Sequence, residues 1–342
     1  MNLERCKTLM RRYIAADIPV FLWGAPGIGK SEAVAQLAAE FDDVAFIDER
    51  LNLYESVDLR GLPRDVDGNV IWSIPELFQR LNEASRTHRL VYLFLDEMNT
   101  AAQSVMTAAM QLVLNRRLGP HIVPKNVRII GAGNRRGDRA AANAMQTALR
   151  SRFANMTGEA DAPTWINWAK DNGIEPVLIG FHDFRQSYGG SLLHIMPKDG
   201  ADDAAAFPTP RGWVFVDKVL KGNPPEDDLH PLTAGLVGKD AAGEFVAFYS
   251  TWRNVPKLAD ILADPDNHPV PGMDKPGLLY ATGVMLANRA TRANFAPIIT
   301  YLDRMPADVA TSAVIEATKR DKSLCATPAF VGWAARNSDV AV

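Results

Sequence analysis

Eight consecutive residues near the start of the chain have the types and spacing needed to hold a phosphate chain. They run Gly24-Ala25-Pro26-Gly27-Ile28-Gly29-Lys30-Ser31 and follow the pattern G-x-x-x-x-G-K-[ST]. The glycines allow the backbone to curve closely around phosphate oxygens and to turn its N–H groups toward them. We expect Lys30 to reach the β- and γ-phosphates and the Ser31 hydroxyl to bind Mg²⁺. This segment, with Glu32 directly after it, therefore predicts a site for ATP or ADP.

The phosphate-binding loop requires a strand before it and a helix after it. The apolar run Val20-Phe21-Leu22-Trp23 predicts a buried strand that leads into the loop. After the loop, apolar residues recur at helical spacing at Val34, Leu37, Ala38 and Phe41. A helix that begins here would add the positive potential of its N-terminus to the site. The local context therefore favours nucleotide binding over an accidental match.

An acidic pair follows the most apolar run of the first half. Val91-Tyr92-Leu93-Phe94-Leu95 predicts a central strand, and Asp96 and Glu97 come directly after it. Ligands of parallel sheets bind at the carboxyl ends of the strands, so we expect this pair beside the phosphate-binding loop. Asp96 is predicted to hold Mg²⁺ through its water shell, and Glu97 to orient and polarise the attacking water. The alternative is that the pair caps the N-terminus of the following helix.

Short apolar runs alternate with helical patterns over the first half of the chain. Further strands are predicted at 44–47, 127–132 and 153–157, and a hairpin is expected to turn at Asp67-Gly68. An amphipathic helix is predicted over 100–115. Strands that alternate with helices are typical of a parallel sheet. We therefore predict an α/β core over residues 1–159 with a five-stranded parallel sheet.

Helical patterns replace strands after residue 160. Asp161-Ala162-Pro163 and Thr209-Pro210 each have the pattern of a helix start with an early proline. Segments rich in proline and glycine separate the helices that follow. We predict a helical lid over 160–222 and a helical C-terminal extension over 223–342.

The composition is that of an ordinary globular protein. Of 342 residues, 47% are hydrophobic and 23% are charged, and the net charge is −3. No overall field therefore draws the molecule to DNA or to anionic lipid. Cys6 and Cys325 have no metal-ligand spacing, and no run approaches the roughly 18 apolar residues of a membrane span. We expect a cytoplasmic protein with no membrane partner.

Four motifs occur in an order that resembles the AAA+ ATPases. After Gly24–Ser31 come Phe-Leu-Asp-Glu-Met-Asn (94–99), Ile-Ile-Gly-Ala-Gly-Asn (129–134) and Ala-Leu-Arg-Ser-Arg-Phe (148–153). Within that class the chain looks like the MoxR-like branch, which is related to the McrB and midasin modules. The resemblance covers about residues 15–222 and implies a P-loop AAA+ core followed by a helical lid. The insertion at 58–73 resembles the helix-2 insert of that branch, and the excursion at 117–121 lies where the family has another hairpin, although both could equally be surface decoration.

The resemblance implies roles for three further side chains. Asn134 matches sensor 1, which contacts the γ-phosphate or the lytic water, and Arg211 matches sensor 2. Arg152 matches the arginine finger that reaches the ATP of a neighbouring subunit, with Arg150 as the alternative. A structural salt bridge is the competing interpretation for either arginine. The predicted catalytic set is then Lys30, Glu97, Asn134, Arg152 and Arg211.

Some residues near the site have open assignments. A cation at a helix N-terminus opposes the helix dipole, so Arg211 should have an anionic partner, either a phosphate or a carboxylate. Arg135-Arg136 and Arg139 depart from the family pattern and could contact nucleotide, a neighbouring subunit or nucleic acid. In some relatives a polar residue of the second strand restrains the catalytic glutamate. The candidates here are Asp48, Arg50 and Asn52.

The resemblance also implies an assembly and a task. A finger that acts between subunits makes a heterologous contact, and repetition of that contact closes a homohexameric ring. Such rings remodel a client or adaptor protein, often one with a von Willebrand factor A domain. Two alternatives stay open: the motor of a DNA-processing or restriction complex, and a nucleotide-gated scaffold with little turnover. The slightly acidic charge counts against the first, and the intact Asp96-Glu97 pair counts against the second.

Overall fold

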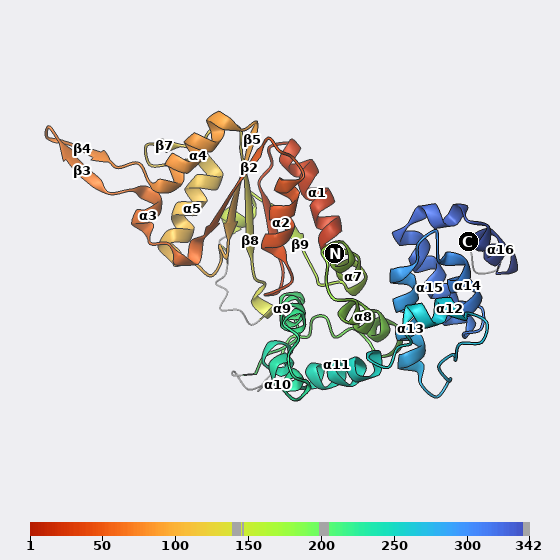
Figure 1. Cartoon of the computed structure of the whole chain (residues 1–342). Coiled ribbons are helices and arrows are strands. Elements are labelled where there is room, and N and C mark those ends of the chain that lie inside the picture. The colour runs from red at the N-terminus through yellow and green to blue at the C-terminus, as the bar shows by residue number, and fades with distance from the viewer. Residues whose placement is uncertain (139–144, 146, 198–204, 338–342) are drawn as a thin grey trace. The chain divides into compact units, whose positions relative to one another are not determined.

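The computed structural model describes residues 1–138, 145, 147–197 and 205–337, and the chain divides into two compact units (Figure 1). The first, which we call the α/β unit, comprises Met1–Thr164 and Thr209–Arg211. The second, the helical unit, comprises Trp165–Pro208 and Gly212–Val342. The separation of the helical region into a lid over 160–222 and an extension over 223–342 stays a prediction.

A five-stranded parallel sheet forms the centre of the α/β unit, as the sequence predicts. Its strands lie in the order β2-β5-β8-β1-β9, so β5 is an interior strand and β8 is the middle one. Val20 pairs with Ile130 on one side and with Ala154 on the other, which sets the register around the phosphate-binding loop. The strands are β1 Val20–Trp23, β2 Val44–Arg50, β5 Leu90–Asp96, β8 Val127–Gly133 and β9 Ala154–Thr157.

Helices cover both faces of this sheet, which explains why its interior strands are apolar on both sides. Tyr92 and Phe94 of β5 pack with α1 (Leu3–Ala15) and α2 (Lys30–Ala39). Their neighbours Leu93 and Leu95 pack with α4 (Glu76–Thr87) and α5 (Gln103–Asn115) on the opposite face. The two apolar layers hold the carboxyl ends of the strands in fixed positions.

One residue of the predicted core lies elsewhere. Phe41 was expected on the buried stripe of the helix after the loop, and this expectation is wrong. The helix α2 ends at Ala39, and the Phe41 side chain is 42% exposed. Its helical spacing in the sequence is therefore a coincidence of the connection to β2.

Two antiparallel hairpins extend from the sheet connections. The first joins β3 (Pro63–Val66) to β4 (Asn69–Trp72), and its turn residues Asp67 and Gly68 have φ values of +53° and +78°. Two left-handed residues in sequence form the predicted type I′ turn. The segment before the hairpin is helical, with η1 at Leu51–Leu53 and α3 at Ser56–Arg60. The second hairpin pairs β6 (Arg117–Leu118) with β7 (His121–Ile122).

Every regular element in the described part of the helical unit is a helix. The remaining elements of the chain are η2 Arg136–Asp138, α6 Thr147–Arg150, α7 Ala162–Asp171, α8 Pro176–Tyr188, α9 Pro210–Lys221, α10 Glu226–Val237, α11 Lys239–Trp252, α12 Leu258–Ala263, α13 Pro276–Arg289, α14 Phe295–Leu302, α15 Ala307–Arg320, η3 Lys322–Ala326 and α16 Pro328–Arg336. Over the residues described, none of the helices combines the length and the apolar character needed to cross a membrane.

Candidate nucleotide site

The phosphate-binding loop joins the end of β1 to the first residue of α2. Gly27 and Gly29 have φ values of +75° and +100°, which a residue with a Cβ adopts only at a cost. Gly29 caps the helix, and α2 begins at Lys30. The Gly24 N–H donates to the Gly133 carbonyl at 3.2 Å, which ties the loop to the end of β8. The local sequence thus builds an open loop whose free N–H groups include those of a helix N-terminus.

Lys30 is buried within this loop and is only 9% exposed. Its Nζ donates to the carbonyl oxygens of Gly24 at 2.8 Å and Ala25 at 3.0 Å, and to Asn134 Oδ1 at 2.9 Å. Burial lowers the pKa of Lys30 to about 8, although Asp96 and other nearby carboxylates oppose the shift. A cation that burial destabilises gains most from an anion, so the ammonium is suited to bind phosphate oxygens.

Ser31 and Asp96 meet at the mouth of the sheet. The Ser31 hydroxyl donates to Asp96 Oδ2 at 2.6 Å, and the Glu97 N–H donates to Asp96 Oδ1 at 2.8 Å. A hydroxyl and a carboxylate are hard oxygen ligands of the kind that Mg²⁺ binds, so the residues fit this ion. No cluster of three or more His, Cys, Asp or Glu that could hold a metal occurs among the described residues. An ion here would complete its coordination with water and phosphate oxygens.

Glu97 lies in a sharp turn after β5. Its φ is +51°, and its carbonyl accepts from the Thr100 N–H at 3.0 Å and the Thr100 hydroxyl at 2.8 Å. The alternative that the acidic pair caps the next helix is wrong, because α5 begins at Gln103 with Ala102 at its N-cap. The Glu97 carboxylate is one of the nearby charges that oppose the lowering of the Lys30 pKa by burial.

Asn134 follows the last residue of β8 and is 9% exposed. Besides the contact of its side chain with Lys30, its backbone is held on both sides by Asn99. The Asn134 N–H donates to Asn99 Oδ1 at 3.1 Å, and Asn99 Nδ2 donates to the Asn134 carbonyl at 2.7 Å. Asn99 belongs to the 94–99 motif, but its residue type alone assigns it no role.

Arg211 lies beside the phosphate-binding loop. Its backbone N–H donates to the Gly27 carbonyl at 3.2 Å, and its side chain is exposed. The guanidinium contributes to lowering the pKa of Lys30, so the two cations share one region of positive potential. Such a pair is suited to a polyanion, and the choice between a phosphate and a carboxylate partner for Arg211 stays a prediction.

Arg150 and Arg152 are both exposed at the end of α6. Within the described part of the chain, neither guanidinium forms an ion pair or a hydrogen bond, so the salt bridge proposed as an alternative is not present there. Phe153 directly after Arg152 is buried, and its ring lies 5.3 Å from that of Phe21. The backbone that carries Arg152 is therefore anchored while its side chain stays available.

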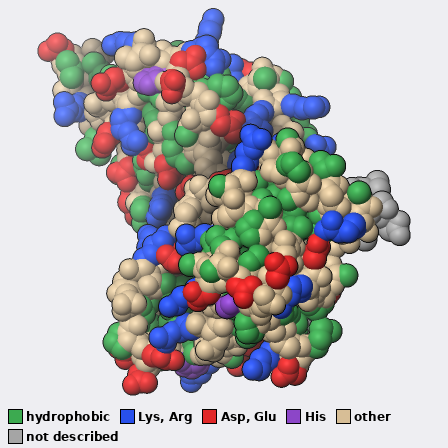
Figure 2. Space-filling view, turned by 45° about the vertical axis from the view of Figure 1, so that its right-hand side comes forward, with side chains coloured by type: hydrophobic (Ala, Val, Ile, Leu, Met, Phe, Trp, Pro, Cys, Tyr) green, Lys and Arg blue, Asp and Glu red, His purple; other side chains and the backbone are tan. Residues whose placement is uncertain are grey.

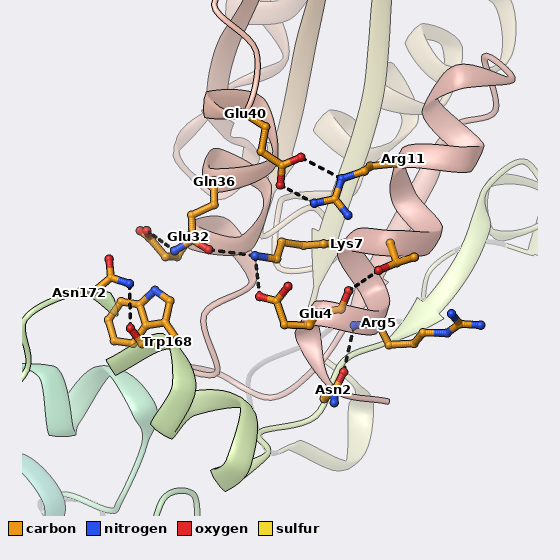
Figure 3. Close-up of polar contacts among 11 residues, drawn as sticks. Asn2, Glu4, Arg5, Lys7, Arg11, Glu32, Gln36, Glu40, Trp168 and Asn172 are labelled. Atoms are coloured by element: carbon orange, nitrogen blue, oxygen red, sulfur yellow. Dashed lines mark hydrogen bonds and ion pairs between the residues drawn. The ribbon is translucent and has the colours of Figure 1, made fainter. Parts of the chain in front are cut away.

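Glu32 occupies the exposed first turn of α2. Its Oε1 accepts from Gln36 Nε2 at 2.9 Å, and Gln36 Oε1 accepts from Lys7 Nζ of α1 at 3.2 Å (Figure 3). Arg11 and Glu40 form a second link between the same helices (Figure 3). Glu32 is thus part of the polar contacts that join α1 and α2. A nucleotide contact for Glu32 stays a prediction.

Of the residues considered for restraining the catalytic glutamate, Asp48 lies on β2 near the acidic pair. Partial burial and the Asp96 carboxylate raise the pKa of Asp48, so these two acids lie near each other. Glu49, which the sequence did not single out, is 5% exposed and accepts from Arg80 Nη1 at 2.5 Å and from the Tyr54 hydroxyl. Only its alternation along the strand could have indicated that it points to the face opposite Asp48.

The added cations after Asn134 are partly accounted for. Arg135 Nε donates to Asp138 Oδ2 at 3.0 Å, and its guanidinium also pairs with Glu159 at 3.5 Å. Arg135 therefore closes the turn after β8 rather than standing free. The Arg136 side chain and Arg139 lie outside the described residues.

A family match covers most of the residues of this site. Residues 19–153 match the family described as AAA domain (dynein-related subfamily). Midasin from Giardia intestinalis is 28% identical over 164 residues, which are 45% of this chain but 3% of that protein. Two mutant forms of Thermotoga maritima RuvB have TM-scores of 0.39 and 0.38, each at 15% identity. They cover 80% and 79% of this chain, and 81% and 79% of their own chains are covered.

Most of the site therefore lies in the part of the chain that matches an AAA domain of the dynein-related subfamily, and a helical region follows that part. This class of domain implies ATP binding and ATPase activity.

Proposed function

We propose that this protein is an ATP-hydrolysing AAA ring ATPase of the MoxR-like kind that remodels a partner protein. The observation that carries the proposal is the convergence of four side chains at one edge of the sheet. Lys30 contacts Asn134, and Ser31 contacts Asp96, over two hydrogen bonds of 2.9 and 2.6 Å. These are groups that can bind a nucleoside triphosphate and its metal ion, and Glu97 directly follows Asp96.

The residues divide the reaction between them. Lys30 and the loop N–H groups bind the phosphates, and Ser31 and Asp96 would hold Mg²⁺, which neutralises charge on the β- and γ-phosphates. Glu97 orients and polarises a water that attacks the γ-phosphorus. The bond from that phosphorus to the bridging oxygen breaks, and ADP and phosphate leave.

The exposure of Arg152 supports the proposal of a ring assembly. Arg152 presents an exposed cation that has no ion-pair partner among the described residues. A finger delivered to the neighbouring subunit makes a heterologous contact. Six such contacts close the proposed hexamer.

The β3–β4 hairpin supports a protein client. Val70, Ile71 and Trp72 are 69%, 51% and 39% exposed, although apolar side chains normally gather in the core. Contiguous exposed apolar groups mark protein-binding surfaces. The net charge of −3 does not favour a nucleic acid partner, and on the face shown in Figure 2 acidic and basic side chains lie among one another. A client or adaptor, such as a von Willebrand factor A-domain protein, fits the hairpin better.

Phosphate release by the purified chain tests the enzymatic part. Glu97→Gln should retain nucleotide binding and lose turnover by about 10²–10⁴-fold, because the group that polarises water is gone. Glu83→Gln, an exposed change on α4, is the matched control and should behave as the wild type. Equal rates for wild type and Glu97→Gln would leave the nucleotide-gated scaffold as the better description.

Capture by the Glu97→Gln protein tests the partner. With ATP present this variant should hold its client, and mass spectrometry then identifies what remains bound. DNA or RNA that accelerates the wild-type ATPase, with an effect that falls steeply with salt, would replace the protein-remodelling role by that of a nucleic acid motor.

A further inference from the structure

We propose that Asn99 is a positioning residue that holds sensor residue Asn134 in place for hydrolysis. This inference rests on the proposed ATPase function. Asn99 touches the backbone of Asn134 rather than its side chain, through bonds of 3.1 and 2.7 Å. It is 1% exposed, so neither bond competes with water.

The two bonds pair the Asn134 backbone in the way that a residue of a neighbouring strand would pair it. The Asn99 amide offers one acceptor and one donor in a plane, and Asn134 offers its N–H and C=O. The Asn99 amide therefore takes the place of the peptide group that a neighbouring strand would supply. At neutral pH an ionised aspartate lacks the donor, and an aliphatic residue of similar size lacks both the donor and the acceptor.

The path of β5 explains why a substitute is needed. The strand pairs with β8 up to Leu95 and Gly131, and the Met98 N–H still reaches the Ala132 carbonyl at 3.0 Å. Between them the chain turns at Glu97, where φ is +51°. Because of this turn, Asn134 lies beyond the paired part of β8. Without Asn99 its backbone N–H and C=O would be buried and unpaired, which is costly.

Gly133 supplies independent support. A Cβ at this position would lie 2.3 Å from Asn99 Oδ1 and 2.9 Å from its Cγ. The φ of Gly133 is not in the left-handed region, so backbone conformation does not require glycine here. The glycine is needed because the Asn99 amide approaches the main chain directly, and the Phe21 ring would lie 3.0 Å from the same Cβ.

The consequence for the reaction lies at the Asn134 side chain. Its Oδ1 meets Lys30 Nζ at 2.9 Å, a contact that only a well-placed backbone can maintain. Asn99 is also three residues from Asp96, on the same turn as Glu97. It thus fixes the distance between the segment that would hold Mg²⁺ and water and the segment that would contact the γ-phosphate.

A double-mutant cycle on kcat tests the positioning role. Asn99→Ala and Asn134→Ala should each lower kcat by about 10–100-fold, while the Kd for a fluorescent ADP analogue changes by less than about threefold. The double variant should be no slower than Asn134→Ala, because Asn99 acts through Asn134. If the two losses multiply instead, Asn99 has a separate role and the proposal is overturned.

Hydrogen exchange at the residue 134 amide tests the geometry without any turnover. The amide should be protected in the wild type and in Asn134→Ala, and should exchange faster in Asn99→Ala and in Gly133→Ala. Gly137→Ala is the matched control, since a Cβ there meets nothing within 4 Å. Unchanged protection in Asn99→Ala would overturn the proposal. Protection that behaves as expected in a chain that hydrolyses no ATP would instead contradict the proposed function.

Asn99→Asp provides a variant of the same shape should Asn99→Ala fold poorly. It keeps the acceptor but places an oxygen against the Asn134 carbonyl. Burial favours the protonated carboxyl, which can donate as the amide did, so its kcat relative to wild type should rise as the pH falls from 8 to about 6. A ratio that does not change with pH would contradict a hydrogen-bonding role.

Discussion

The α/β unit and the helical unit treat their buried polar side chains differently. In the α/β unit these groups are Lys7, Lys30, Glu49, Asp96, Asn99, Asn134 and Asp138, and each takes part in a hydrogen bond or ion pair. In the helical unit they are His182, Asp217, Thr233, Thr282 and Thr327. There the threonines Thr282 and Thr327 bond only to their own helix or turn, and the ring nitrogens of His182 have no partner among the described atoms.

The difference separates chemistry from packing. Charged groups stay buried only where partners offset the cost of desolvation, and most of those in the α/β unit converge on the carboxyl ends of β5 and β8. His182 is instead enclosed by rings, with Trp165 and Trp213 centroids at 4.7 and 4.6 Å. The first unit is thus built to stabilise an ionic ligand, and the second to exclude water. Four changes test this contrast, from the largest effect to the smallest.

Arg152 should give the largest effect, although it is exposed. Arg152→Ala should keep nucleotide binding and lose about 10³–10⁵-fold in turnover, as expected for a finger that stabilises the transition state. Mixing it with Lys30→Ala protein should restore part of the ATPase rate, because some interfaces then combine an intact loop with an intact finger. Arg150→Ala is the matched comparison. Normal turnover by rings of the Arg152→Ala protein would disprove the assignment between subunits.

Two lysines compare the units directly. Lys30→Ala should lower kcat/KM for ATP by about 10²–10³-fold, because a preorganised cation is removed from the phosphates. Lys221→Ala removes a lysine that bonds Asp217 at 2.6 Å in the helical unit, and it should leave kcat/KM unchanged. Equal losses in a steady-state ATPase assay would show that the proposed division of roles is wrong.

His182 should make the helical unit sensitive to acid. Complete burial lowers the pKa of His182 to about 3, below the usual 6.5. The unfolded chain therefore binds a proton first, and stability is lost as the pH falls below 6.5. Between pH 7 and pH 5 the loss is about 2 kcal/mol, measurable by urea unfolding followed through tryptophan fluorescence.

The control for this measurement is His182→Leu, which has a similar volume and no titration. Its free energy of unfolding should fall less than that of the wild type over the same pH range. If both proteins lose the same stability, the acid sensitivity arises at another group.

The hairpin should give the smallest effect on stability. Val70→Ser with Ile71→Ser should change the free energy of unfolding by no more than about 0.5 kcal/mol, because both side chains are exposed. Capture of a client by the Glu97→Gln background should nevertheless be lost. Val331→Ser, at a residue 59% exposed in the helical unit, should change neither property. Retained capture by the hairpin variant would direct the search to another surface.

Much of the architecture could be predicted from the sequence because it depends on local patterns. The fully buried run of β5, the Asp67-Gly68 turn and the loop at Gly24–Ser31 each have a short-range signature. The prediction that Phe41 belongs to the helix was wrong, because one residue at helical spacing cannot reveal where α2 ends. The capping interpretation of Asp96-Glu97 failed because a six-residue turn, 97–102, precedes α5.

By itself the sequence determined that a phosphate-binding loop, an acidic pair and a polar residue would each follow a strand. Only the tertiary structure decided which of them meet. Lys30 and Asn134 are 104 residues apart, and Asn99 and Asn134 are 35 apart. They come together because β8 lies between β5 and β1, and the ladder registers place the ends of these strands side by side. Hydrogen bonds require placement within tenths of an ångström, which the packed sheet supplies and a residue pattern cannot.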